Sequence, residues 1–260
     1  MTHPNPMPDF VAAETGRPAG SLLGGQVIVA QPEDGYRVAV DAVLLAAAID
    51  AAPGQRILDL GCGIGSAALC LAWREPSLQI VGLDRETAFL DFARGNVIAN
   101  AMQERVSLAL GDVLDPPPEL GRFDQVMANP PYLKPGTATV SAHPLKAAAT
   151  MEGKARLADW IACAAAVLRP GGIFTVIHRA DRLGDLLLAL APRFGGILIL
   201  PIHPKRDRRA KRVILRAVLG SGERLAVLPG FRLHEEDGAF TTAADAILRR
   251  GAALPLEVLP

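Results

Sequence analysis

The feature that most constrains the fold is a regular alternation of short apolar runs and longer amphipathic segments. The strand-like runs lie at 56–60, 79–83, 106–110, 123–128 and 173–178, and the helix-like segments at 64–74, 85–100 and 157–168. Repeated strand–helix–strand units predict a parallel sheet with helices on both faces. Two late runs, 197–202 and 213–219, are joined by a short charged loop, which favours an antiparallel strand at the sheet edge. We therefore expect an α/β fold with a mostly parallel, seven-stranded sheet.

The flanking segments suggest one domain with short extensions. Residues 1–21 are rich in Pro and Gly and are expected to be a flexible leader. Runs at 26–30 and 36–40 flank a turn-like segment, which predicts an N-terminal β-hairpin, and Asp41 is a candidate cap for a helix ending near Ala52. These segments, 22–52, precede a core over 53–250, so that one domain spans 22–250 and 251–260 form a tail.

Charge is divided unevenly along the chain. The first 133 residues carry 8 Lys/Arg against 16 Asp/Glu, and the remainder carries 19 against 11, although the net charge is zero. Such a division suggests that one part of the molecule meets an anionic partner. The alternative is that the charges mix on the folded surface, because sequence halves need not be spatial halves.

Cysteine usage and hydropathy indicate a cytoplasmic protein. The three cysteines form no CxxC pair, which argues against a disulfide framework or a zinc site. The N-terminus lacks a basic-then-apolar signal pattern, and the apolar stretch 186–202 is interrupted by Pro192 and Arg193. The acidic segment after His234 has no second, suitably spaced histidine, so no metal is expected.

A glycine-rich loop follows the first core strand, with the sequence Asp59-Leu-Gly61-Cys62-Gly63-Ile-Gly65. Alternating glycines let a backbone turn tightly and approach a ligand closely. A dinucleotide site would have glycine where this chain has Ser66, and Asp59 would repel pyrophosphate oxygens. A carboxylate at this position suits a ligand with an ammonium group instead.

Two further carboxylates stand at the ends of the next two strands. Asp84 is placed to accept hydrogen bonds from ribose hydroxyls, and Asp112 lies within reach of an adenine amino group. This succession, from Asp59 through Gly65 to Asp84 and Asp112, resembles the Rossmann-like class I methyltransferases. The resemblance implies S-adenosylmethionine as cofactor, with Cys62 in the binding loop; NAD is the less favoured alternative.

The most specific motif is Asn129-Pro130-Pro131-Tyr132, directly after the fourth strand. Consecutive prolines stiffen the backbone and leave its carbonyls free to accept hydrogen bonds. The Asn129 side-chain oxygen and the Pro130 carbonyl are candidates to hold both hydrogens of a planar amine, while Tyr132 stacks on its ring. Such chemistry depends on positioning and electrostatics rather than on a strong base. A motif of this kind after the fourth strand resembles that of the methyltransferases that act on the planar amine of adenine, of rRNA guanine or of a protein glutamine amide.

Further segments resemble the bacterial tRNA1(Val) adenine methyltransferase family. They are 35–45, 177–183, 203–215 and 233–238, so the similarity covers about residues 22–250. It implies methylation of the exocyclic amine of adenine in an RNA, with a tRNA of the tRNA1(Val) type as the expected substrate. The chain departs from the family in the loop after Tyr132, where Met151-Glu152 replaces a His-Glu pair.

A dense basic cluster favours RNA as the partner. The cluster spans 205–212, and its candidate phosphate-binding residues are Lys205, Arg206, Arg208, Arg209, Lys211 and Arg212. Lys134, in the loop after Tyr132, is a further candidate. The alternatives are a solvated hairpin tip for this segment and, for the whole chain, a non-catalytic RNA-binding protein of the same fold.

Overall fold

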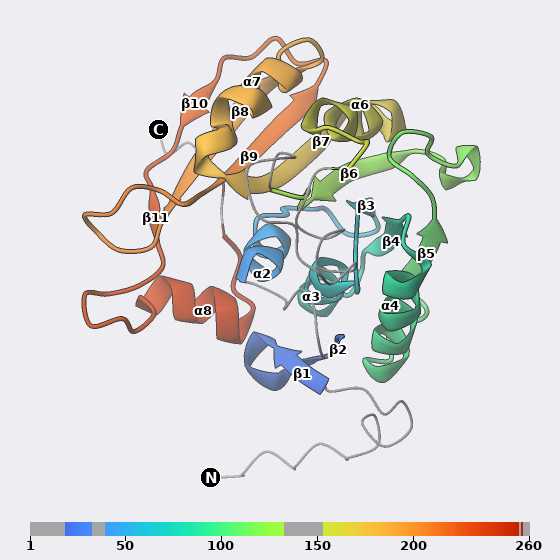
Figure 1. The fold of residues 1–260 in the computed structure, drawn as a ribbon, viewed down its shortest axis with the longest axis horizontal. Coiled ribbons are helices and arrows are strands. Elements are labelled where there is room, and N and C mark those ends of the chain that lie inside the picture. Colours follow the sequence, from blue (N-terminus) through green and yellow to red (C-terminus); the bar gives the residue numbers. More distant parts are fainter. Residues whose placement is uncertain (1–18, 33–39, 133–152, 255, 257–260) are drawn as a thin grey trace.

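The computed structural model describes residues 19–32, 40–132, 153–254 and 256. Its centre is a sheet whose parallel part follows the predicted alternation (Figure 1). The strands are β3 (Arg56–Leu60), β4 (Gln79–Asp84), β5 (Val106–Leu110), β6 (Phe123–Ala128) and β7 (Leu168–Arg179). The helices between them are α3 (Ser66–Arg74), α4 (Thr87–Ala99) and α6 (Leu157–Val167). The predicted α/β fold is confirmed.

The last two long strands form the predicted antiparallel pair. They are β8 (Phe194–His203) and β9 (Arg212–Leu219), and β9 runs antiparallel to both β7 and β8. The position of the antiparallel strand differs from the expectation, because β9 lies between β7 and β8 and not at the edge of the sheet.

The sheet also exceeds the expected seven strands. Two additional strands, β10 (Ala226–Val227) and β11 (Phe231–Arg232), pair in parallel with β8. The resulting order is β10-β8-β9-β7-β6-β3-β4-β5. Strands of two residues are too short to produce a hydrophobic alternation, which explains why the sequence did not predict them.

The N-terminal hairpin exists, but with different partners from those predicted. β1 (Ala19–Leu22) pairs with β2 (Val27–Ala30) through the 3₁₀ turn Leu23–Gly25. Positive φ angles at Gly24 and Gly25, 64° and 98°, allow this turn, so the end of the expected leader belongs to the fold. The other expected hairpin strand, 36–40, falls largely outside the described residues, and Val40 begins helix α2 (Val40–Ala47).

Helices cover both faces of the sheet, as expected (Figure 1). One apolar cluster joins α2, α3 and α8 (Thr242–Arg250) through residues such as Leu44, Leu69 and Ile247. The opposite cluster joins α6 to α7 (Leu183–Leu190) through residues such as Ile161 and Leu186. Among the described residues, no helix combines the length and the apolar character needed to cross a bilayer.

Sheet direction determines where functional residues can meet. β3, β4, β5, β6 and β7 are mutually parallel, so their carboxyl ends share one edge. β9 starts at this same edge, because Arg212 is the register partner of Arg179 at the end of β7. The segment between β8 and β9 therefore emerges beside the loops that follow the parallel strands.

Candidate functional site

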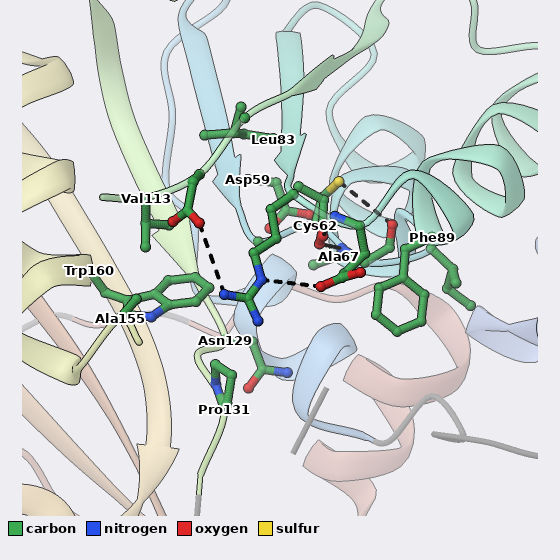
Figure 2. Close-up of a pocket in the computed structure, with 18 of the residues that line it drawn as sticks. Asp59, Cys62, Ala67, Leu83, Phe89, Val113, Asn129, Pro131, Ala155 and Trp160 are labelled. Atoms are coloured by element: carbon green, nitrogen blue, oxygen red, sulfur yellow. Dashed lines mark hydrogen bonds and ion pairs between the residues drawn. The ribbon is translucent and has the colours of Figure 1, made fainter. Parts of the chain in front are cut away.

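A pocket opens at the carboxyl edge of the sheet, between the ends of β3, β4, β5 and β6 (Figure 2). Its lining combines carboxylates, the glycine loop and the segment after β6. Nine predicted site residues contribute to it: Asp59, Gly61, Cys62, Gly63, Asp84, Asp112, Asn129, Pro131 and Tyr132. The structure thus brings together residues that are far apart in the sequence.

The glycine loop adopts the conformation that its composition predicts. Gly61, Gly63 and Gly65 have φ angles of 72°, 56° and 85°, which side-chain-bearing residues rarely adopt. The amides of Gly61 and Cys62 both donate to the Leu83 carbonyl, at 2.8 Å and 2.9 Å. The indole of Trp160 lies so close to Gly61 that a Cβ there would collide with its ring. A glycine is therefore required by both conformation and packing.

Asp59 lies beneath this loop and is almost completely buried, with 2% exposure. The amide of Ala68 donates to its Oδ2 at 3.1 Å. Burial is the main reason why the pKa of Asp59 rises to about 7, with the nearby Asp84 carboxylate adding to the rise. A cationic ligand group next to Asp59 would favour the ionised form.

Asp84 ends β4 and organises the glycine loop. Its Oδ2 accepts from the Gly63 amide at 2.8 Å, and its Oδ1 accepts from the Glu86 amide at 2.9 Å. Burial raises the pKa of Asp84, while these two amide donors oppose the rise. Each carboxylate oxygen retains a further lone pair, so a ligand diol can still be accepted.

Asp112 borders the pocket after β5 and is more exposed than the other two carboxylates. Its Oδ1 accepts from the Leu114 amide at 3.0 Å. Arg85 lies between two acids, with 4.0 Å from Nη1 to Asp112 Oδ2 and 3.2 Å from Nε to Glu86 Oε1; both pairs are dashed in Figure 2. Arg85 is thus held at the pocket by ion pairs with two acids.

The segment after β6 forms the opposite wall. Asn129 and Pro131 both line the pocket, and Figure 2 shows them close together on one side of it. The Tyr132 hydroxyl contacts Asn129 Oδ1 and donates to Asp41 Oδ2 at 2.7 Å. Pro130 and Gly65 adjoin lining residues in the sequence but are not lining residues themselves.

Tyr132 is enclosed by neighbours from β7 and β9. The ring of His178 meets it edge-on at 5.4 Å, and the Arg212 guanidinium lies over its face at 4.9 Å from the ring centre. Burial, reinforced by the positive charge of Arg182, lowers the pKa of His178 to about 4. His178 is therefore neutral at pH 7 and packs against Tyr132 as an uncharged ring.

The basic cluster lies at the same sheet edge, outside the pocket. Arg206, Arg208, Arg209 and Lys211 are exposed, and the Lys205 ammonium donates to the Glu236 carbonyl at 2.7 Å. Arg212 differs, because its Nε donates to Asp41 Oδ2 at 2.8 Å. The other predicted basic residue, Lys134, lies outside the described residues.

Several pocket residues were not predicted from the sequence. Arg85, Phe89, Val113 and Trp160 line the pocket, and Asp41 contacts its motif from α2. Arg85 and Val113 directly follow the predicted carboxylates Asp84 and Asp112, so their positions in the sequence could have indicated that they lie at the pocket. No such signal existed for Phe89, Trp160 and Asp41, because each occupies an ordinary position in a helix and the sequence there does not indicate a contact with the pocket or its motif.

The pocket chemistry fits S-adenosylmethionine. Asp59, Asp84, Glu86 and Asp112 would repel a pyrophosphate, whereas an ammonium group and a ribose diol match them. A Cβ at Gly63 would meet open space, so the loop leaves room for a ligand beside it. Among the described residues, no group of three His, Cys, Asp or Glu is arranged to hold a metal ion.

Comparisons with known proteins agree with this chemistry. The methyltransferase small domain family matches residues 36–195. The tRNA1(Val) (adenine(37)-N6)-methyltransferase of Phocaeicola vulgatus is 34% identical over 187 residues, covering 69% of this chain and 75% of that protein. Its Porphyromonas gingivalis counterpart (strain ATCC 33277) is 36% identical, covering 68% and 72% respectively.

A solved structure shows the same fold. It is a predicted O-methyltransferase from Agrobacterium tumefaciens, 29% identical, with a TM-score of 0.70; the match covers 84% of this chain and 100% of that one. The family match spans more than half of the chain and includes the glycine loop, the three carboxylates and the Asn-Pro-Pro-Tyr motif. The chain therefore belongs to the methyltransferase small domain family, and S-adenosylmethionine is its methyl donor.

Proposed function

We propose that this enzyme methylates the exocyclic amine of adenine in a tRNA of the tRNA1(Val) type. The observation that carries the proposal is the position of Asn129 and Tyr132 on the wall of the cofactor pocket, at the sheet edge that also bears the basic cluster. The names of the curated relatives support the same substrate. The chemical problem for such an enzyme is to present a weakly nucleophilic amine in the correct orientation.

The cofactor half of the pocket would hold the donor by its polar groups. Asp59 lies where a carboxylate can face the ammonium group, Asp84 where it can accept from the ribose, and Asp112 where it can accept from the adenine amine. When bound, S-adenosylmethionine supplies an electrophilic methyl group. Phe89 and Trp160 add apolar walls that exclude water from this region.

The Asn129–Tyr132 segment would orient the target amine. An adenine amine is planar because its lone pair is delocalised into the ring. Two acceptors, the Asn129 side-chain oxygen and the Pro130 carbonyl, can each take one N–H and direct the lone pair toward the donor. The prolines keep the second acceptor fixed. Positioning of this kind requires no general base.

The basic edge would bind the tRNA backbone. Lys205, Arg206, Arg208, Arg209 and Lys211 lie between β8 and β9 beside the pocket, and we extend the same role to Lys134. A shallow groove next to them is lined by His203, Arg206, Phe231 and Arg232, which combines cations with an aromatic ring. Phosphates and an unstacked base match these chemical types. The target adenine must leave its stack to reach the pocket, and a loop base does so most easily.

The cellular setting follows from the same proposal. A tRNA substrate and three free, buried thiols are consistent with a reducing cytoplasm.

The decisive experiment identifies the methylated nucleoside. The enzyme is incubated with labelled S-adenosylmethionine and, separately, tRNA, rRNA, DNA and release-factor protein; the products are digested and separated. We expect label in N6-methyladenosine from tRNA, and none with Asn129→Ala. Label in guanine, in a hydroxyl group or in glutamine would reject the proposed substrate while leaving the cofactor assignment intact.

A further inference from the structure

Asp41 is a buried carboxylate that the sequence suggested only as a helix cap. It lies in the first turn of α2, and its side chain is 3% exposed. Its Oδ2 accepts from the Tyr132 hydroxyl at 2.7 Å and from Arg212 Nε at 2.8 Å. A carboxylate removed from water in this way requires charged and hydrogen-bonded partners, and these two supply them.

Two acceptor oxygens compete for the single hydrogen of the Tyr132 hydroxyl. Both Asp41 Oδ2 and Asn129 Oδ1 lie within hydrogen-bond distance of that hydroxyl. A phenolic hydroxyl has only one hydrogen, so it can donate to only one of the two oxygens. Hydrogen bonds to a charged acceptor are about twice as strong as neutral ones, which favours donation to the Asp41 carboxylate.

The orientation of the Asn129 amide follows from this competition. When the Tyr132 hydroxyl donates its hydrogen to Asp41, it can act toward Asn129 only as an acceptor. The two ends of an asparagine amide are distinguished by their hydrogen-bond partners rather than by shape. The favoured arrangement therefore places Asn129 Nδ2 against Tyr132 and leaves Oδ1 available to another donor.

We propose that Asp41 and Arg212 are positioning residues that act through Tyr132 to hold the Asn129 side-chain oxygen toward the target amine. Arg212 contributes twice, because it ion-pairs with Asp41 and lies over the Tyr132 ring at 4.9 Å. Arg212 also ends the basic segment, so its guanidinium supports the reacting group rather than a phosphate. This inference rests on the proposed role of Asn129 as the acceptor for the substrate amine.

A double-mutant cycle tests the inference. The variants are Asp41→Asn, Tyr132→Phe and the double variant, assayed for single-turnover methylation of tRNA with saturating cofactor. We expect each single variant to lose about tenfold to a hundredfold in rate, and the double variant to lose no more than the worse single one. The dissociation constants for cofactor and tRNA should stay within about twofold, because the network acts on orientation.

Two further variants address folding. Asp245→Asn is the matched control, because it removes the ion pairs of Asp245 with Arg249 and Arg250 on α8 and should leave the rate unchanged. Melting temperatures identify any variant that unfolds. If Asp41→Asn does not fold, the cycle of Arg212→Lys with Tyr132→Phe keeps the buried carboxylate and should again be non-additive.

Defined outcomes overturn the inference. Rate losses that multiply in the double variant, or a folded Asp41→Asn with the wild-type rate, would show that Asp41 does not act through Tyr132. The outcome for the substrate is separate. If the wild type methylates another planar amine and not tRNA, the substrate proposal fails, and the same cycle on that acceptor still decides the role of Asp41.

Discussion

The two halves of the carboxyl edge carry opposite charge. Where β3 and β4 end and after β5, the pocket has Asp59, Asp84 and Asp112; beyond β6 the edge has Arg212 and the basic cluster. The strand order explains the contrast, since β3 to β6 form one side of the sheet and β7 to β11 the other. Among the described strands, those of the acidic half of the sequence and those of the basic half therefore lie on opposite sides of the sheet. The boundary between them is the place where Asn129 faces the cofactor pocket.

The largest loss of activity is expected when the group at the boundary between the acidic and basic sides of the edge is removed. Asn129→Ala should lower kcat by about 1000-fold, because an amine held by one acceptor loses its orientation. Cofactor affinity, measured by calorimetry, should be unchanged, since the acidic half remains intact. Full turnover in this variant would remove Asn129 from the mechanism.

Charge reversal on the basic side should have the next largest effect. Arg208→Glu combined with Arg209→Glu should weaken tRNA binding by about a hundredfold at low salt and reduce its salt dependence. Filter binding at several salt concentrations measures both quantities, and cofactor affinity should not change.

The chain offers a matched control for this reversal. Arg193 and Arg224 are exposed arginines at the opposite end of the β8–β9 pair. Arg193→Glu with Arg224→Glu makes the same change in net charge. Equal losses in the two double variants would mean that net charge, rather than the basic edge, binds the RNA.

A change on the acidic side should affect the cofactor alone. Asp84→Asn removes a charged acceptor and should weaken cofactor binding by about 30-fold, as expected for loss of a hydrogen bond to a charged group. Titration calorimetry checks this, and tRNA affinity should be retained. Asp91→Asn, an exposed position on α4, is the control. An unchanged dissociation constant for Asp84→Asn would contradict its contact with the ribose.

The smallest expected effect is a pH dependence of cofactor binding. Asp59 has a pKa of about 7, so it is mostly protonated below that pH and mostly ionised above it. Because the ammonium group favours the ionised form, binding must release a proton below about pH 7, and affinity should rise about tenfold between about pH 6 and about pH 8.

The ligand amine itself titrates near the upper end of this range, so the comparison must be made against Asp59→Asn. The ratio of the two affinities isolates the contribution of Asp59. Calorimetry in buffers of different ionisation enthalpy counts the released proton. A ratio independent of pH would show that Asp59 does not face the ammonium group.

Much of the fold was predictable because its signals are local. The bounds of β3, β5 and β6 equal the predicted runs, since each is a short, mainly apolar segment between polar turns. Elements without such a signal were missed. Most of β1 was assigned to the leader because glycine and proline dominate its surroundings, and α7 overlaps the start of the apolar stretch 186–202, for which no helix was predicted.

The residues of the candidate site also fall into those that local sequence motifs indicate and those that only the folded structure brings to the site. The glycine loop, the carboxylates at strand ends and the Asn-Pro-Pro-Tyr motif depend on residues within one loop, so the sequence indicates them directly. Trp160 covers Gly61 from a helix almost a hundred residues away, and nothing at position 160 signals that contact. Contacts of this kind depend on how helices are placed over the sheet.

Local patterns in the sequence predicted the strands and helices from β3 to β7, the glycine loop and the Asn-Pro-Pro-Tyr motif, because periodicity and turn chemistry act over a few neighbouring residues. The position of β9 between β7 and β8 is a property of the tertiary structure. That insertion brings Arg212 to Asp41, 171 residues earlier in the chain, and both to Tyr132. Strand order sets which distant side chains share an edge, and no local pattern records it.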